Sequence, residues 1–141
     1  SYAVPPTVYR FDTDTGKTEL FAKPDVAFNP ADFLTEQRFY TSKDGTRIPM
    51  FLVRRKDSLG GGPRPTLLYG YGGFNIAVAP SFDAPKLAWL EQGGVLAVAN
   101  LRGGGEYGAS WHNAGRLQAK QNVFDDFIAA GEYLIDQGIT S

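Results

Sequence analysis

The stretch TLLYGYGGFN, residues 66–75, joins a short apolar run to a glycine-rich segment, and VLAVANLRGGGEYG, residues 95–108, repeats this order. Continuous apolar runs of this length predict strands that are buried in a sheet covered on both faces. Glycine allows the backbone to turn sharply and to approach a ligand closely. Because open α/β sheets bind ligands in loops at the carboxyl ends of their strands, these two segments are the candidate functional loops.

A helix is predicted after each of these strands. Residues 83–92 form the first, with Asp83 as its N-cap. Residues 122–137 form the second, with Asn122 as its N-cap. Its apolar side is predicted from the apolar or small residues at 124, 127, 128, 131, 134 and 135. The order strand, helix, strand, helix predicts an α/β fold with a parallel sheet.

An antiparallel hairpin is predicted upstream of these elements. Residues 36–41 and 46–54 flank Asp44-Gly45, which is a strong hairpin signal. The second arm is apolar on both faces, so we expect it to pack against a neighbouring layer. Pro49 lies within this arm and predicts an edge position or a bulge, because proline cannot donate a ladder hydrogen bond.

The first 25 residues are predicted to be separate from this domain. Residues 8–11 and 18–21 alternate and flank a turn, which indicates two paired strands. An isolated pair of strands is marginally stable in water, so we expect them to belong to a larger sheet that lies mostly outside this chain. We place the domain boundary near Val26. A further parallel strand is expected beyond Ser141, so the chain is interpreted as an excerpt.

Composition excludes several classes of function. The chain has 141 residues, of which 43% are hydrophobic and 21% charged, as in ordinary globular domains. The net charge of −1 offers no electrostatic footprint for nucleic acid or for an anionic membrane. There is no cysteine, which excludes disulfides and thiolate metal sites. No apolar run approaches the roughly 18 residues of a membrane span. We expect no metal and no cofactor.

The second glycine loop contains the pattern G-x-G-x-x-G at residues 103–108, which is found in dinucleotide-binding folds. Such a loop should open directly into a helix and be followed about 20 residues later by an acidic residue at a strand end. Here residues 111–115 intervene, and the acids at that distance, Asp125 and Asp126, lie inside a predicted helix. Nucleotide binding is therefore disfavoured.

The first glycine loop fits acyl-transfer chemistry better. Attack on an amide carbonyl creates a tetrahedral oxyanion, which preset hydrogen-bond donors stabilise. In α/β-hydrolases one such donor lies in the loop after the third strand of the fold. Tyr71 offers a phenol in a glycine-rich loop at a strand end. On this chemistry alone, Tyr71 is equally well explained as a packing residue.

Several motifs together carry a more specific signal. In chain order they are SKDGTRIPMF at residues 42–51, YGYGGFN at 69–75, ANLRGGGEYG at 99–108, Trp111-His112, and KQNVFDDF at 120–127. They resemble the prolyl oligopeptidase (prolyl endopeptidase) family, and the resemblance extends over residues 32–141. The related oligopeptidase B group typically lacks Gly-Phe-Asn after Tyr71-Gly72, which favours the proline-specific branch.

The resemblance implies a serine peptidase that cleaves short peptides on the carboxyl side of proline. It implies an α/β-hydrolase domain, whose first part would be residues 26–141, and a β-propeller, whose last strands would be residues 1–25. Tyr71 would be the catalytic donor to the oxyanion, and Phe74 would line the pocket for the substrate proline. The Ser-Asp-His triad would lie outside this chain, since no serine here has the G-x-S-x-G setting. The excerpt alone is therefore expected to be inactive.

Other residues are given structural roles. His112 is the only histidine and matches no catalytic position of the family, so it is interpreted as structural or surface-exposed. Arg102, Glu106 and Tyr107 are expected to brace the second glycine loop by hydrogen bonding.

Two rival functions remain open: a non-catalytic binding module on the hydrolase scaffold, and another acyl hydrolase such as an esterase. The expected partners are short proline-containing peptides, with no nucleic acid and no membrane. The parent protein is expected to be monomeric and cytoplasmic, with a periplasmic or secreted location as the alternative.

Overall fold

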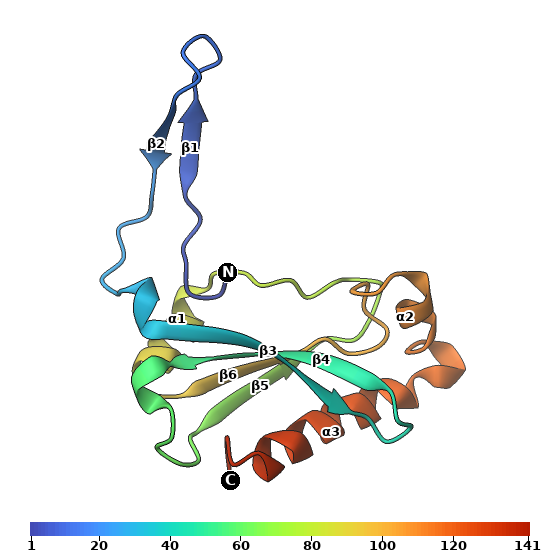
Figure 1. The fold of residues 1–141 in the computed structure, drawn as a ribbon. Coiled ribbons are helices and arrows are strands. Elements are labelled where there is room, and N and C mark those ends of the chain that lie inside the picture. The colour runs from blue at the N-terminus through green and yellow to red at the C-terminus, as the bar shows by residue number, and fades with distance from the viewer.

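The computed structural model describes all of residues 1–141 (Figure 1). Its main sheet contains four strands: β3 (Phe33–Thr41), β4 (Arg47–Arg55), β5 (Thr66–Gly70) and β6 (Val95–Ala99). Their order in space is β3-β4-β6-β5. β5 and β6 are parallel, whereas β4 pairs antiparallel with both β3 and β6. The predicted hairpin and the predicted parallel strand pair are both confirmed.

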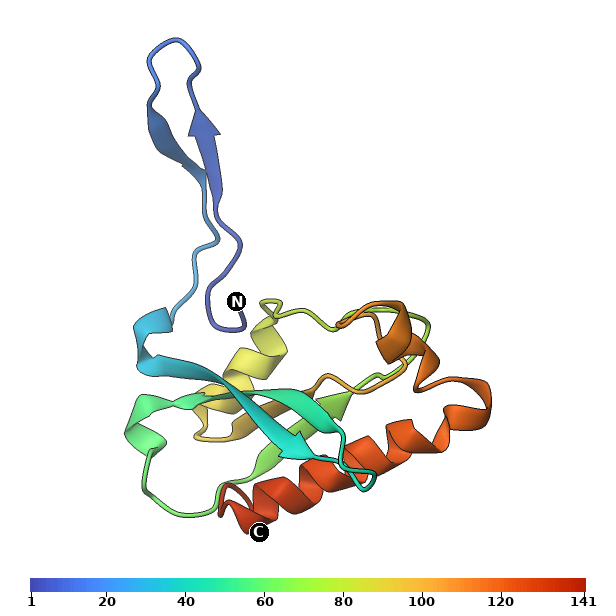
Figure 2. The ribbon, with the colours of Figure 1, turned by 45° about the vertical axis from the view of Figure 1, so that its right-hand side comes forward.

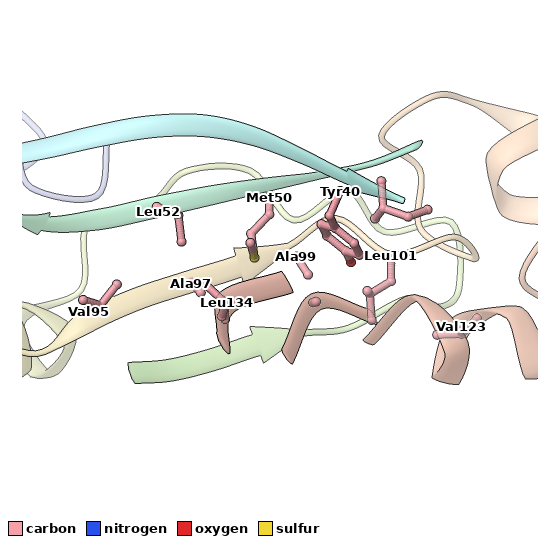
Figure 3. Packing of buried hydrophobic residues seen from close by; sticks show 11 residues of the cluster. Tyr40, Met50, Leu52, Val95, Ala97, Ala99, Leu101, Val123 and Leu134 are labelled. Carbon is pink, nitrogen blue, oxygen red and sulfur yellow. The ribbon is translucent and has the colours of Figure 1, made fainter. Parts of the chain in front are cut away.

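Helices cover the two faces of this sheet. α1 (Ala84–Glu91) lies on one face and α3 (Gln121–Asp136) on the other (Figures 1 and 2). β6 supplies side chains to both layers, with Val95, Ala97 and Ala99 in the core cluster beneath α3 (Figure 3). Leu96 and Val98 lie in the cluster beneath α1. Because successive strand residues point to opposite faces, a strand covered on both sides is apolar throughout.

The position of Pro49 differs from its prediction. β4 is an interior strand between β3 and β6, not an edge strand. Pairing with β6 covers only Met50–Val53, so Pro49 lies just beyond the paired stretch. Its carbonyl accepts a hydrogen bond from the Asn100 amide at 2.9 Å, while its nitrogen is not required by the ladder. An interior strand therefore tolerates proline where its pairing with one of its two neighbours ends.

β5 also differs from its prediction, since it was expected to be buried. It forms one edge of the sheet, and its residues alternate in exposure. Leu67 is 45% exposed and Tyr69 is 42% exposed. Both lie on the face that carries α1, which packs over β6 and β4. The short apolar run therefore predicted the strand correctly, but it did not predict that one face of the strand is exposed.

The helix bounds agree with prediction to within one residue, and Asp83 is the N-cap residue of α1 as predicted, whereas the N-cap residue of α3 is Lys120 and not Asn122. The Asp83 side chain makes no capping hydrogen bond and instead pairs with Lys86 Nζ at 3.1 Å. α3 begins one residue earlier than predicted, with Lys120 at its N-cap. The Asn122 amide donates to the Ala114 carbonyl at 2.9 Å. In both cases another partner takes the side chain that local sequence had assigned to the helix end.

The buried face of α3 differs from the predicted one, although Leu134 belongs to both. Its buried residues are Val123, Asp126, Ala130 and Leu134. The predicted apolar side is largely exposed, including Phe124, Phe127, Ile128 and Ile135. The helix is thus rotated so that a carboxylate, and not an aromatic ring, enters the core.

β1 (Val8–Phe11) and β2 (Thr18–Ala22) form a separate two-stranded antiparallel sheet, as predicted. The hairpin projects away from the main sheet (Figures 1 and 2), and all of its strand residues are exposed. Its strands pair only with each other in this structure. The remaining short elements are α2 (Ala109–Asn113) and the 3-10 turns Pro30–Asp32, Lys56–Ser58 and Leu117–Ala119. None of the helices has both the length and the apolar character needed to cross a membrane.

Candidate active site

The two glycine loops meet at the carboxyl edge of the parallel strands. β5 and β6 run side by side in register from Thr66 opposite Val95 to Gly70 opposite Ala99, so their following loops leave the sheet together. The Asn75 amide of the first loop donates to the Gly103 carbonyl of the second at 3.1 Å. The loops therefore form one hydrogen-bonded structure, at the edge where the sequence placed the candidate site.

Glycine is required where the loops touch. Gly103 has φ +91°, and a Cβ added there would lie 2.6 Å from the Gly72 carbonyl oxygen. A Cβ on Gly72 (φ +60°) would lie 2.4 Å from a methyl carbon of Val123. Lys120 Nζ donates to the same Gly72 carbonyl at 3.0 Å. Both glycines serve close backbone packing at this junction.

Tyr71 and Phe74 lie next to each other on the first loop. Their ring centroids are 6.5 Å apart, with the planes inclined at 34°. Tyr71 is 44% exposed and Phe74 is 83% exposed, so neither ring is part of the core. Phe74 and Asn75 have φ values of +52° and +57°, which is a left-handed conformation that non-glycine residues rarely adopt. This turn presents the Phe74 ring at the surface.

A cavity of about 580 Å³ opens beside Phe74. Its lining residues are Gly73, Phe74, Gly103, His112, Gly115, Arg116, Leu117 and Lys120. Leu117 is 80% exposed and has φ +51°. The cavity wall thus combines two apolar residues with left-handed backbones, Phe74 and Leu117, with the cationic side chains of Arg116 and Lys120. Strained conformations of this kind concentrate at binding and catalytic sites.

The short helix α2 attaches to the second glycine loop through two consecutive residues. Trp111 Nε1 donates to the Leu101 carbonyl at 3.0 Å, and the Trp111 carbonyl accepts from the Gly103 amide at 2.9 Å. His112 Nδ1 lies 2.7 Å from the Gly103 carbonyl oxygen and 3.1 Å from the Asn75 nitrogen. The histidine interpreted from sequence as structural or surface-exposed is therefore located between the two candidate loops.

A buried ion pair fixes the start of the second loop. Asp126 is fully buried, and its carboxylate accepts from Arg102 Nη2 at 2.6 Å, from Arg102 Nε at 3.0 Å and from the Arg102 backbone amide at 3.1 Å. Ser42 Oγ donates to the same carboxylate at 2.6 Å. The Arg102 guanidinium also binds Asp44 in the β3–β4 turn. Arg102 thus braces the loop as predicted, whereas the role of Asp126 was missed.

These contacts shift the pKa values of the charged groups. Hydrogen bonding to Asp126, and then to Asp44, raises the pKa of Arg102 above its usual range, although its burial acts in the opposite direction. Hydrogen bonding from Arg102 lowers the pKa of Asp44 well below its usual range. Both groups are therefore charged at neutral pH.

The lowered pKa of Asp44 predicts a pH-dependent stability. Because the folded state holds this carboxylate ionised, its contribution is complete above the unfolded pKa of about 4 and is lost as the pH falls below that value. In the intact protein, Asp44→Asn should lower the urea midpoint at pH 7, and the difference should be smaller at pH 3, because the contribution shrinks from the unfolded pKa down toward the lowered folded pKa. Asp25→Asn, at an exposed position, is the control. An Asp44→Asn difference that is equally large at both pH values would contradict the prediction.

Glu106 and Tyr107 support the second loop in different ways. Glu106 Oε1 accepts from the Val78 amide at 2.9 Å and from Asn100 Nδ2 at 3.2 Å, as predicted. Tyr107 makes an edge-on ring contact with Trp111, with centroids 5.0 Å apart, in place of the expected hydrogen bond. The helix that follows the G-x-G-x-x-G pattern has only five residues, and the downstream Asp126 is bound to Arg102. Neither matches a dinucleotide site.

The chain is thus a mixed α/β protein whose candidate site lies at the carboxyl edge of its sheet. Residues 80–141 match the model of the prolyl oligopeptidase family. A prolyl endopeptidase of Elizabethkingia miricola is 54% identical over 141 residues, covering 100% of this chain and 20% of the relative. In sequence and in fold, this chain is therefore similar to proteins of the prolyl oligopeptidase family.

Solved structures show the same similarity. A prolyl endopeptidase structure superposes with a TM-score of 0.91 at 58% identity, over 100% of this chain and 21% of that one. Oligopeptidase B from Leishmania major superposes with a TM-score of 0.88 at 34% identity, over 100% of this chain and 20% of that one. The chain is therefore more similar to this prolyl endopeptidase than to this oligopeptidase B. It spans about a fifth of the length of the relatives that it matches.

Proposed function

We propose that the intact protein is a serine peptidase that hydrolyses short peptides on the carboxyl side of proline. The observation that carries the proposal is the exposed Tyr71–Phe74 pair on a glycine loop at the carboxyl edge of the sheet, in a chain similar to this family. The similar prolyl endopeptidases support the substrate class.

Tyr71 is the proposed oxyanion donor. When a serine oxygen attacks the substrate carbonyl, the carbonyl oxygen gains negative charge, and a preset hydroxyl donor stabilises that charge. The loop after β5 has the strand-end position from which α/β-hydrolases supply one such donor. The 44% exposure of Tyr71 supports this role, because a side chain packed in the core could not reach a substrate.

Phe74 is the proposed wall of the proline pocket. An aromatic ring offers the pyrrolidine ring of proline a flat apolar surface. An exposure of 83% leaves this ring available for such contact. The 6.5 Å separation of the two ring centroids allows one bound residue to contact both side chains.

The proposed domain division places residues 1–25 in a β-propeller and residues 26–141 in an α/β-hydrolase catalytic domain. The separate β1–β2 sheet supports the division, because both of its faces are exposed in this chain. The Ser-Asp-His triad is proposed to lie outside residues 1–141, so this segment alone would be inactive.

A serine-directed phosphonate tests the proposal. The intact protein is expected to lose activity toward a proline-containing peptide as it becomes labelled, and peptide mapping should locate the label outside residues 1–141. A substrate peptide should slow the labelling. An unlabelled, inactive protein would support the binding-module alternative, whereas labelling accompanied by a preference for esters over proline peptides would support an esterase.

A further inference from the structure

His112 contacts both glycine loops through a single atom, Nδ1. Its Nδ1 atom, the Gly103 carbonyl oxygen and the Asn75 amide nitrogen form a triangle with sides of 2.7, 3.1 and 3.1 Å. This triangle joins α2 to both glycine loops. It lies one peptide bond from Phe74 and at the wall of the cavity beside it.

The distances determine which imidazole nitrogen carries the proton. The Asn75 amide points at both Nδ1 and the Gly103 carbonyl oxygen, each 3.1 Å away. Because two acceptor atoms repel each other at 2.7 Å, Nδ1 is assigned the hydrogen and donates it to the Gly103 carbonyl, which leaves that oxygen as the acceptor for the Asn75 amide. The Asn75 amide donates to the same oxygen. One carbonyl therefore accepts from both the imidazole and the first loop.

The Gly103 carbonyl needs such support because the peptide that contains it joins two glycines. Glycine rotates freely about its backbone dihedrals, and Gly103 already has φ +91°. The N–H of the same peptide, on Gly104, makes only a long hydrogen bond of 3.3 Å to the Leu101 carbonyl. Without the imidazole, this peptide could therefore turn and withdraw its oxygen from Asn75. The His112 hydrogen bond keeps the oxygen in place.

The Asn75 amide in turn determines the conformation of Phe74. Its nitrogen belongs to the Phe74–Asn75 peptide, so holding its N–H restrains ψ of Phe74. Both residues are left-handed, at +52° and +57°, and such conformations persist only where the surroundings enforce them. If the restraint is removed, Phe74 can relax and its ring can move away from its present place.

We propose that His112 is a positioning residue for substrate selection. By donating from Nδ1 to the Gly103 carbonyl, it holds Asn75 and keeps the Phe74 ring in the orientation that receives proline. This inference rests on the proposed function and adds a residue to it. The proposed role of His112 is positional, and no proton transfer is assigned to it.

Three substitutions in the intact protein test the proposal. His112→Ala removes the donor. His112→Asn places an amide donor at the same distance from Cβ, and His112→Asp places an acceptor there. Asn113→Ala, at the exposed neighbouring position on α2, is the matched control. Titration with the phosphonate counts active molecules, so that partial unfolding does not enter kcat or KM.

The decisive quantity is the ratio of kcat/KM for a peptide with proline before the scissile bond to that for the same peptide with alanine. His112→Ala and His112→Asp should lower this ratio about 10-fold, mainly through KM of the proline peptide. His112→Asn should restore most of it, and Asn113→Ala should leave it unchanged. The acidic limb of the pH–rate profile should remain in all four variants.

Several results would overturn the inference. An unchanged ratio in His112→Ala, or equal ratios for His112→Asn and His112→Asp, would remove the donor role. Loss of the acidic limb in the variants would make His112 an acid–base group instead. If the unsubstituted protein shows no preference for proline, the proposed function itself fails, and this outcome is distinct from the others.

Discussion

Tyr71→Phe is expected to lower the turnover of a proline peptide by about 10²-fold, the lower end of the effect of losing one oxyanion donor. The substitution removes one hydroxyl from a ring that is 44% exposed, so it should leave the fold intact. Because this hydrogen bond would strengthen in the transition state, kcat and kcat/KM should fall together while KM stays nearly constant. Steady-state kinetics on the intact protein measure both quantities.

Tyr69→Phe is the matched control for this experiment. Tyr69 lies two residues earlier on β5, and at 42% its exposure is similar. Its ring lies 5.5 Å from Lys86 Nζ on α1, on a face of the sheet and not in the glycine loop. The turnover of the Tyr69→Phe variant should be unchanged. Unchanged turnover in Tyr71→Phe as well would remove Tyr71 from the mechanism.

Asp126→Ala is expected to lower the free energy of unfolding by about 3–5 kcal/mol, the cost of leaving one partner of a buried ion pair uncompensated. The carboxylate is fully buried and accepts from the Arg102 side chain, the Arg102 amide and the Ser42 hydroxyl. Its removal leaves the guanidinium with only the half-exposed Asp44 as an ionic partner. Urea unfolding of the intact protein at pH 7 measures the change.

The neighbouring residue provides the control for this prediction. Asp125 is only partly buried and makes a single helix-surface hydrogen bond, with Gln121, so Asp125→Ala should change the free energy by about 0.5 kcal/mol or less. Arg102→Leu combined with Asp126→Leu should cost less than the sum of the two single changes, because no buried charge is left unpaired. Additive costs, or a neutral Asp126→Ala, would show that the pair is not the brace described here.

Local sequence was sufficient for most of the elements. Asp44-Gly45 marked the β3–β4 turn, and the apolar run at 95–99 marked a strand covered on both faces. The turn residues after Phe11 likewise indicated the β1–β2 hairpin. In each case neighbouring residues in the chain determine the conformation, so the signal is contained in a short window.

The partners of the two predicted N-cap side chains and the buried face of α3 could not be predicted from such short windows. Asp83 and Asn122 are good N-cap residues, but each meets a different partner in the folded chain. The buried face of α3 was predicted from its apolar residues, but the residues that are buried include the carboxylate of Asp126. Asp126 lies three residues after Val123 and four before Ala130, a spacing that places all three on one side of a helix. A carboxylate can be buried on that side only because it pairs with Arg102, which lies 24 residues earlier in the chain.

The candidate site divides in the same way. Tyr71 and Phe74 could be chosen from their glycine setting and from the family resemblance. His112 could not be chosen in this way, because its proposed role depends on contacts with distant residues. Its Nδ1 atom lies 2.7 Å from the Gly103 carbonyl oxygen and contacts the Asn75 amide, 37 residues earlier in the chain.

Short windows of the amino-acid sequence were enough to predict the kinds and order of the strands and helices, the two glycine loops and the resemblance to the prolyl oligopeptidase family. These depend on hydrophobic periodicity and on backbone preferences, which act over a few residues. Only the tertiary structure decided which face of α3 is buried and which carboxylate binds Arg102, and it alone showed that the single histidine joins the loops. Those contacts depend on where distant segments meet, and a hydrogen bond forms only when its atoms come within about 3 Å of each other.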